Sequence, residues 1–389
     1  MRILLVNHFP LEGSGSGIYT KNIAQRLLDK GHKVKVIAVD NQKVENNQYQ
    51  FPVETLVYED FPCFTTHPKS NNQFYNLTKA EIENYLNSFE EIINKAAEEF
   101  EADLIHAQHL WVAPYAAQST NLPYIITAHG TDLKGFKEDQ RYREIALEGA
   151  KNAEKIITIS DQVHQDVKKY FSPPEAKLRK ILNGVDDNLF KVLEPDRLEL
   201  LQKYVPEIEE DPSYLITFVG KLTEFKGVDL LIEAAQKYEK EFPGITTLII
   251  GSGELSAQLK AKAEKLNLEK LYFLGNLKQN ELPALYSSAD LSIVPSRVEP
   301  FGLVAVEALA CGTPVIASRA GGLPDFINPE VGRLFEMDNS DDLAAKIKQG
   351  INEEDKAKKG EYAADYALNK FSWARVIDEL LEVYHSILK

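Results

Sequence analysis

The residues with the clearest chemical potential lie between Ile293 and Gly322, where Glu299 precedes Gly302 and Glu307 follows it. Gly302 has no Cβ, so an anion can approach its backbone closely. A helix that starts there offers unpaired N–H groups, which suit a phosphate. Because carboxylates repel phosphate, the two glutamates are better placed to accept hydrogen bonds from sugar hydroxyls. For either glutamate alone, the alternative is a surface residue favoured by the helix dipole.

The elements that position these residues are a strand, a loop, a helix and a second strand. The apolar run Leu291–Val294 predicts a buried strand, which Pro295 ends. Leu303–Ala310 are good helix formers, and Pro314 lies just beyond them. Val315–Ala317 predict the next strand. This order aims the start of the helix at the crevice beside a sheet edge.

Two lysines and two glycines follow other predicted strands. Lys221 and Lys226 flank a turn after the strand predicted over Tyr214–Val219, where two cations suit a diphosphate. Taken alone, an exposed lysine is usually only solvated. Gly251 and Gly253 follow the next strand, and we expect their loop near a nucleotide base or diphosphate.

A glycine-rich loop near the N-terminus gives a weaker indication. The predicted order is a strand at Ile3–Val6, a loop over Asn7–Gly17 and a helix over Ile18–Lys30. The dinucleotide fingerprint G-x-G-x-x-G fails for two reasons. Ile18 stands where the last glycine belongs, and the glycines begin several residues after the strand, whereas the fingerprint follows the strand immediately. A flexible turn is the alternative for this loop.

Three histidines follow or lie in predicted strands. His129 comes directly after the strand Tyr124–Ala128, and α/β proteins bind ligands at the carboxyl ends of parallel strands. The spacing of His106 and His109 invites a metal interpretation, but no cysteine or carboxylate stands at ligand spacing beside them. We therefore predict no metal site, and we expect these two histidines to line a cleft.

Composition narrows the class of protein. A chain of 389 residues suits two domains. The formal net charge of -15 argues against nucleic acid as a partner. Cys63 and Cys311 lie far apart, so no disulfide framework is implied. The N-terminus reads as a strand rather than a signal peptide, and no apolar run reaches membrane-spanning length. We therefore expect a cytoplasmic protein with at most peripheral membrane association.

The order of elements predicts an α/β fold with two doubly wound Rossmann-like domains that face a central cleft. A polar linker over Asp187–Pro212 separates the two series of strands and helices. The predicted domains are residues 1–190 and 191–368, with a terminal helix in 369–389. Residues 353–360 are highly charged and are predicted to be a solvated segment. Trp373 is predicted to be a packing anchor.

The string E-P-F-G-L-V-A-V-E-A-L-A-C-G-T-P-V-I-A resembles the E-x7-E signature of retaining glycosyltransferases of family 4, and the similarity extends across nearly the whole chain. The resemblance implies the GT-B fold, with an acceptor-binding first domain and a nucleotide-sugar-binding second domain. The terminal helix of this fold crosses back to pack on the first domain. It implies that Glu299 contacts the transferred sugar and that Glu307 holds the nucleotide ribose. The amides after Phe301, at Gly302 and Leu303, would meet the diphosphate.

Further motifs of this family match at other positions. The string H-G-T-D resembles the H-G-x-D motif, whose histidine, here His129, touches the donor sugar. Lys221 and Lys226 match its G-R-…-K-G element, except that Lys221 stands where arginine is usual, so a bidentate clamp becomes a point charge. The resemblance also implies that Gly15 and Gly17 lie near the donor phosphate and the acceptor.

The function implied is transfer of a sugar, with retention, from a nucleotide diphosphate-sugar to a carbohydrate, lipid or small-molecule acceptor. UDP-sugars are the commonest donors in the family. The catalytic residues would be His129, Glu299 and Lys226, with no metal and no other cofactor. The alternatives are a non-hydrolysing sugar-nucleotide epimerase or a phosphorylase on the same fold, a non-catalytic subunit, and a dinucleotide-dependent oxidoreductase.

Overall fold

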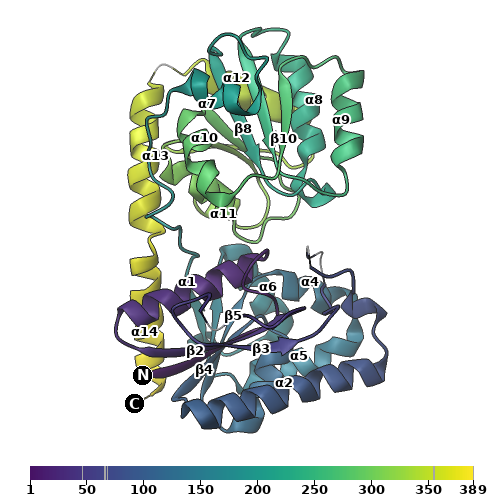
Figure 1. Ribbon diagram of the computed structural model, residues 1–389, viewed down its shortest axis with the longest axis vertical. Helices are drawn as coiled ribbons and strands as arrows, with labels where there is room; N and C mark the ends of the chain where they lie inside the picture. Colours follow the sequence, from purple (N-terminus) through teal and green to yellow (C-terminus); the bar gives the residue numbers. More distant parts are fainter. Residues whose placement is uncertain (46, 65–66, 68, 354, 389) are drawn as a thin grey trace. The chain divides into compact units, whose positions relative to one another are not determined.

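The chain folds into two compact units (Figure 1). The computed structural model describes residues 1–45, 47–64, 67, 69–353 and 355–388. Met1–Gly184 and Trp373–Lys389 form the first unit, and Val185–Ser372 form the second. These boundaries lie a few residues from those predicted at 190 and 368. Val185 N donates to Phe371 O over 2.7 Å, so the chain enters and leaves the second unit at the same place.

The first unit is built on a seven-stranded parallel sheet with the order β3-β2-β1-β4-β5-β6-β7. The order reverses between β1 and β4, which makes this the switch point where open α/β sheets bind ligands. Residues of β1 pair with β2 on one side and with β4 on the other, in parallel register. The strands are β1 Arg2–Asn7, β2 Lys33–Asp40, β3 Val53–Val57, β4 Leu104–Gln108, β5 Tyr124–Ala128, β6 Lys155–Thr158 and β7 Leu178–Lys180.

Helices connect these strands, and local signals set where they start. Thr78 and Glu81 form a capping box, which starts α2 at Lys79. The Ser14 side chain accepts a hydrogen bond from Gly17 N, so α1 begins at Gly15. The helices are α1 Gly15–Asp29, α2 Lys79–Phe100, α3 Val112–Ala117, α4 Thr131–Glu138, α5 Arg143–Asn152, α6 Asp161–Phe171 and α14 Trp373–Ile387.

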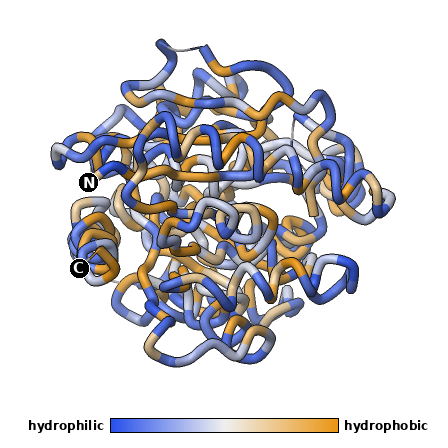
Figure 2. Tube along the Cα trace, turned by 90° about the horizontal axis from the view of Figure 1, so that it is seen from below, coloured by the Kyte–Doolittle hydropathy of each residue, from blue (hydrophilic) through white to orange (hydrophobic). Residues whose placement is uncertain are grey.

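The C-terminal helix α14 belongs to the core of the first unit. Trp373 and Leu380 are buried in the same hydrophobic cluster as residues of β1, β2 and α1. In Figure 2, the helix that ends at the C label carries hydrophobic and hydrophilic residues in alternation, as one buried and one exposed face require. The packing role predicted for Trp373 is confirmed. His106 does not line a cleft, since it is fully buried and its ring nitrogens bond Tyr384 and Thr127.

The second unit repeats this architecture with a six-stranded parallel sheet, in the order β10-β9-β8-β11-β12-β13. Its order also reverses once, between β8 and β11, and both sheets confirm the doubly wound α/β prediction. The strands are β8 Tyr214–Val219, β9 Ile245–Ile250, β10 Leu271–Gly275, β11 Leu291–Val294, β12 Val315–Ser318 and β13 Gly332–Phe335. The helices are α7 Arg197–Tyr204, α8 Val228–Tyr238, α9 Ser256–Lys265, α10 Leu282–Ser288, α11 Leu303–Ala310, α12 Ser340–Ile351 and α13 Lys356–Lys370.

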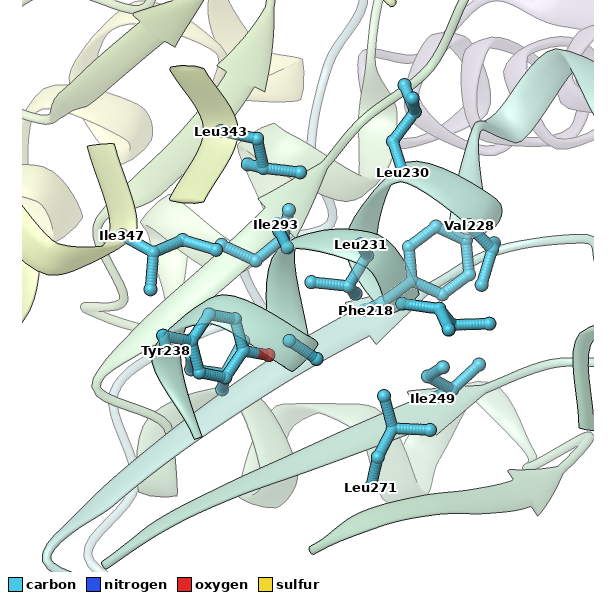
Figure 3. Packing of buried hydrophobic residues seen from close by; sticks show 14 of the residues in the cluster. Phe218, Val228, Leu230, Leu231, Tyr238, Ile249, Leu271, Ile293, Leu343 and Ile347 are labelled. Carbon is cyan, nitrogen blue, oxygen red and sulfur yellow. The ribbon is translucent and has the colours of Figure 1, made fainter. Parts of the chain in front are cut away.

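The core of the second unit fixes the strands that carry its site. Figure 3 shows Leu343 and Ile347 of α12 facing Ile293 of β11 and Tyr238 of α8. The Tyr238 hydroxyl is not orphaned there, because it lies 2.7 Å from Thr247 Oγ1 on β9. The strand ends of β8 and β11 are therefore held by dense packing on one face of the sheet.

None of the described residues in the predicted solvated segment, 353 and 355–360, is fully buried, but its second half belongs to a helix that the sequence did not predict. Helix α13 starts at Lys356, and its buried residues are Ala363, Ala364 and Ala367. Alanine gives a weak hydrophobic signal, so the periodicity of this helix is hard to read. Its small face nevertheless lets α13 pack closely on α11.

Shortening a buried leucine of α14 tests whether this helix is part of the core. Leu380→Ala should lower the free energy of unfolding of the first unit by about 2–5 kcal/mol. Leu381→Ala is the matched control, because Leu381 is only partly buried against the same cluster, and it should cost less than half as much. Denaturant unfolding of both variants measures the difference, and equal losses would contradict a core role for α14.

Candidate functional site

Glu299 and Lys226 meet at the carboxyl edge of the second sheet. Lys226 Nζ lies 2.6 Å from Glu299 Oε2, and Ser296 Oγ donates to the same oxygen over 3.0 Å. The Glu299 side chain is only 9% exposed, so its charge is compensated almost entirely by these two partners. Sequence reasoning missed Ser296, whose only signal was its place in the loop before Glu299.

Two glycines make this meeting possible by removing a side chain from the backbone. Gly227 has φ +63, and a Cβ there would lie 2.0 Å from Pro295 O. Gly321 has φ +55, and a Cβ there would lie 1.8 Å from Glu299 O. The lysine turn and the glutamate loop are therefore pressed against their neighbours more closely than any other residue would allow.

The helix α11 starts beside Glu299. Its N-cap is Gly302, with φ +107, where a Cβ would lie 2.6 Å from Leu323 Cδ2. The first helical bonds to Gly302 O come from Ala305 N and Val306 N. The preceding amides, at Leu303 and Val304, belong to the first turn, where N–H groups have no partner within the helix. These amides can hold an anion at the positive end of the helix.

The Phe301 side chain does not lie with Lys226, Glu299 and the first amides of α11. The ring is buried and packs against Phe326 and Phe371, at centroid distances of 5.5 and 5.9 Å. The ring is therefore not placed to touch a ligand, and the prediction that Phe301 belongs to the donor site rests on the backbone beside it. The Phe301 ring anchors the start of α11 to the aromatic cluster near the end of α13.

Glu307 lies farther along α11 and has an unusual charge state. Burial raises the pKa of its carboxyl to about 7. The carboxyl lies near Tyr286 and Cys311, since its charge contributes to the raised pKa of both. Glu307 is therefore a destabilised carboxylate that would gain from hydroxyl donors supplied by a ligand.

The structure explains why positions 251 and 253 are glycines, which the sequence alone did not show. A Cβ at Gly251 would lie 1.9 Å from Gly220 O, and one at Gly253 would lie 2.4 Å from Leu222 O. The loops after β8 and β9 thus pack backbone against backbone. Lys221 is exposed in the first of these loops. Contact of these residues with a nucleotide stays a prediction.

The remaining predicted residues belong to the first unit. Gly15 and Gly17 were expected in a loop but form the first turn of α1. A Cβ at Gly17 would lie 2.2 Å from Pro10 O, whereas the space around Gly15 is open. His129 is buried after β5, and its Nε2 lies 2.9 Å from Gln108 Oε1. A carboxamide oxygen only accepts, so Nε2 carries the proton. Burial beside His109 lowers the pKa of His129 well below its usual value, which keeps the ring neutral.

Metal and membrane features were sought in the part of the chain that the structure describes. No group of three or more histidine, cysteine or acidic side chains there could hold a metal ion. Within the same residues, no helix combines the length and the apolar character needed to cross a bilayer.

Comparison with known proteins decides the family. The model of Glycosyltransferase Family 4 matches residues 13–189, and that of Glycosyl transferases group 1 matches residues 203–366. Glycogen synthase of Mycobacterium tuberculosis is 30% identical over 297 residues, which cover 72% of this chain and 68% of that protein. The chain belongs to the family 4 glycosyltransferases.

Other glycosyltransferases match along their whole length. D-inositol 3-phosphate glycosyltransferase of Corynebacterium jeikeium is 28% identical and covers 100% of this chain and 97% of its own. Sucrose-phosphate synthase from Thermosynechococcus elongatus has a TM-score of 0.79 and 21% identity, over 99% and 98% of the two chains. Anabaena HepE, solved in complex with UDP, has a TM-score of 0.79 and 23% identity, over 99% and 100%. These structures confirm the predicted GT-B fold.

Membership of this family narrows the alternatives that the sequence left open. The protein is a transferase, and this class replaces the epimerase and the dinucleotide-dependent oxidoreductase. A phosphorylase also transfers a glycosyl group, so that alternative stays open. Asp40 ends β2, where a dinucleotide-binding fold places the acid that holds the ribose. Its carboxylate is instead engaged within the chain, since it accepts from Lys69 Nζ over 2.7 Å.

The raised pKa of Glu307 predicts how stability depends on pH. The folded-state pKa of about 7 exceeds the ordinary value of 4.5, so the stabilising effect of the protonated form is complete below pH 4.5 and is lost as the pH rises through 7. Glu307→Gln removes this penalty. The variant should match wild type at pH 4.5 and exceed it by about 1–2 kcal/mol at pH 8.

Denaturant unfolding curves at both pH values measure this difference. Glu264→Gln on α9 is the control, because Glu264 is exposed, and it should shift stability by only a few tenths of a kcal/mol at either pH. A Glu307→Gln effect of the same size at pH 4.5 and pH 8 would show that burial does not penalise the Glu307 charge.

Proposed function

We propose that this protein transfers a sugar from a UDP-sugar to an acceptor hydroxyl, with retention at the anomeric carbon and without a metal ion. One observation carries the proposal. The Lys226–Glu299 pair lies beside the start of α11, and Glu307 lies on the same helix. A cation from the turn after β8, the first amides of α11 and two carboxylates around them fit the parts of a nucleotide diphosphate-sugar.

The diphosphate would bind at the amides of Leu303 and Val304, beside Lys226. Its charge suits the positive end of α11, and the two carboxylates would face hydroxyl groups instead. Glu299 would accept from the transferred sugar. Glu307 would accept from the ribose, which offers the donors that this carboxyl lacks. Lys221 would add a second positive charge from the neighbouring loop.

In the reaction, the bond between the anomeric carbon and the phosphate oxygen breaks while the acceptor oxygen attacks on the same face. The acceptor proton passes to a phosphate oxygen of the departing diphosphate. The chain's part is to stabilise the charge that develops on that leaving group, and Lys226, Lys221 and the α11 amides would do so. His129 would offer its unprotonated Nδ1 to a sugar hydroxyl.

The alternative route is a double displacement with Glu299 as the nucleophile. Both hydrogen bonds to this carboxylate use Oε2. Tight pairing with Lys226 and Ser296 makes the group a weaker nucleophile, which favours the front-face route.

The choice of donor and of a metal-free mechanism has two supports. HepE of Anabaena, which shares this fold, is described in complex with UDP-glucose. Lys226 also provides, at the diphosphate position, the positive charge that a divalent cation would otherwise supply. A nucleotide-sugar donor and a hydroxyl acceptor are therefore the partners that we propose, with no cofactor.

A donor screen tests the proposal. We expect UDP to raise the melting temperature more than GDP or ADP, because ligands that bind only the folded state stabilise it. UDP release from UDP-glucose, and from other UDP-sugars, should continue in excess EDTA. Preference for GDP or ADP would overturn the donor assignment, and loss of activity in EDTA would overturn the metal-free mechanism. The anomeric configuration of the product, read by NMR, tests retention.

Two alanine variants separate the roles of the glutamates. Glu307→Ala should weaken UDP binding about tenfold or more, since it removes a charged acceptor from the ribose. Glu299→Ala should keep UDP affinity within about threefold and lower kcat about a hundredfold or more. Glu264→Ala on α9 is the surface control. Calorimetry and initial rates distinguish these effects, and equal UDP affinity in wild type and Glu307→Ala would contradict the role of Glu307.

A further inference from the structure

Arg297 lies two residues before Glu299 and is bonded to three other segments of the second unit. Its Nη1 and Nη2 donate to the two carboxylate oxygens of Asp229, at the start of α8, over 2.9 and 2.8 Å. Nη1 also donates to Glu224 O over 2.8 Å, and Nε donates to Asp338 Oδ1. The guanidinium thus forms a planar fork on Asp229, a geometry that arginine provides and lysine does not.

The same residue holds the backbone of the short turn Glu224–Lys226, which we call the lysine turn. Arg297 N donates to Phe225 O over 2.7 Å. That oxygen belongs to the peptide bond that leads into Lys226. Because Glu224 O accepts from the Arg297 side chain, both carbonyls that precede Lys226 in this turn are bonded to Arg297. The backbone from which the Lys226 side chain projects is therefore held by one residue of the glutamate loop.

Charge balance keeps the guanidinium in this place. Asp229 lies in the first turn of α8, and Asp338 follows β13. Burial alone would raise the pKa of Asp229, but the hydrogen bonds from Arg297 bring this pKa below its ordinary value. Only 23% of the Arg297 side chain and 30% of the Asp229 side chain are exposed, so salt and water screen the pair weakly. A partly buried, bidentate pair keeps its geometry better than a single ion pair at the surface.

The other link between the lysine turn and the glutamate loop is the ion pair of Lys226 with Glu299. Under the function proposed above, Lys226 turns to the diphosphate and Glu299 to the transferred sugar when the donor binds. Their mutual ion pair then weakens. Arg297 and Asp229 bind no part of the donor in that arrangement, so their pair persists and keeps the lysine turn in register with the loop.

We propose that Arg297 is a positioning residue for glycosyl transfer: together with Asp229, it fixes the turn that aims Lys226 at the diphosphate of the donor. The proposal rests on the proposed function. Arg297 would not touch the donor itself, since Nε, Nη1 and Nη2 all donate within the chain. Without the fork, the lysine turn would shift. Lys226 would then hold the diphosphate less well, while the contacts of the nucleoside would stay as they are.

Nucleotide affinities test this inference without requiring turnover. Titration of the full chain would compare UDP with uridine, which lacks the diphosphate, in wild type and in Arg297→Gln. We expect the variant to bind UDP about tenfold or more weakly and uridine within about twofold, because only the diphosphate contacts a displaced charge. Arg297→Lys keeps the charge but not the fork, so its UDP affinity should stay about fivefold or more below that of wild type.

Two comparisons separate positioning from general damage. Arg333→Gln is the matched control, because the Arg333 side chain is 25% exposed and its ion pair, with Glu353, does not involve the lysine turn. It should leave both affinities within about twofold. When Lys226 is already replaced, as in Lys226→Ala, adding Arg297→Gln should weaken UDP binding by no more than about twofold, since the effect acts through Lys226.

The double variant Arg297→Gln/Asp229→Asn covers the case in which Arg297→Gln folds poorly, because it leaves no carboxylate of Asp229 without its partner. It should show the same selective loss of UDP affinity. Equal losses for UDP and uridine, wild-type UDP affinity in Arg297→Gln or Arg297→Lys, or a full additional loss in the Lys226→Ala background would each overturn the inference. Failure of the proposed function would appear separately, as a wild type that binds no nucleoside diphosphate and releases none from any donor.

Discussion

The ion pair between Lys226 and Glu299 is the interaction on which the site of the second unit depends. It joins two loops that are far apart in the chain. A side chain at Gly227 would collide with Pro295 O in the glutamate loop, and one at Gly321 would collide with Glu299 O. Glu299 is nearly buried, and a buried carboxylate that loses its partner is strongly destabilising. The pair therefore fixes the positions of both loops. The start of α11 follows directly from this geometry, since Gly302 comes just after Glu299.

The two carboxylates of the E-x7-E motif have opposite local environments. Glu299 has a cation and a hydroxyl as partners. Glu307 is partly buried on α11 without such compensation, and desolvation raises its pKa. The first arrangement keeps a charge in a fixed place. The second leaves the Glu307 charge poorly stabilised until a ligand supplies hydrogen-bond donors. The folded protein thus loses some stability, and ligand binding recovers it.

The fold could be read from the sequence, because apolar strands and glycine breaks have strong local signals. The roles of the site residues stay predictions. The contacts could not be read in this way, since they join distant residues. The pairing of Lys226 with Glu299, and the approach of Gly251 to Gly220, depend on how β8, β9 and β11 lie side by side. Phe301 was predicted to lie at the donor site because its neighbours in the motif, Glu299 and Gly302, are predicted to lie there. Helix α13 was missed because its buried face consists of alanines.

The path of the chain through the two units has a consequence for biosynthesis. The first unit receives α14 only after the whole second unit has been made. Until then, the buried faces of α1 and β1 that pack against Trp373 and Ile377 lack their cover. A nascent chain would thus expose this apolar surface throughout most of its synthesis, and premature termination would leave it uncovered for good.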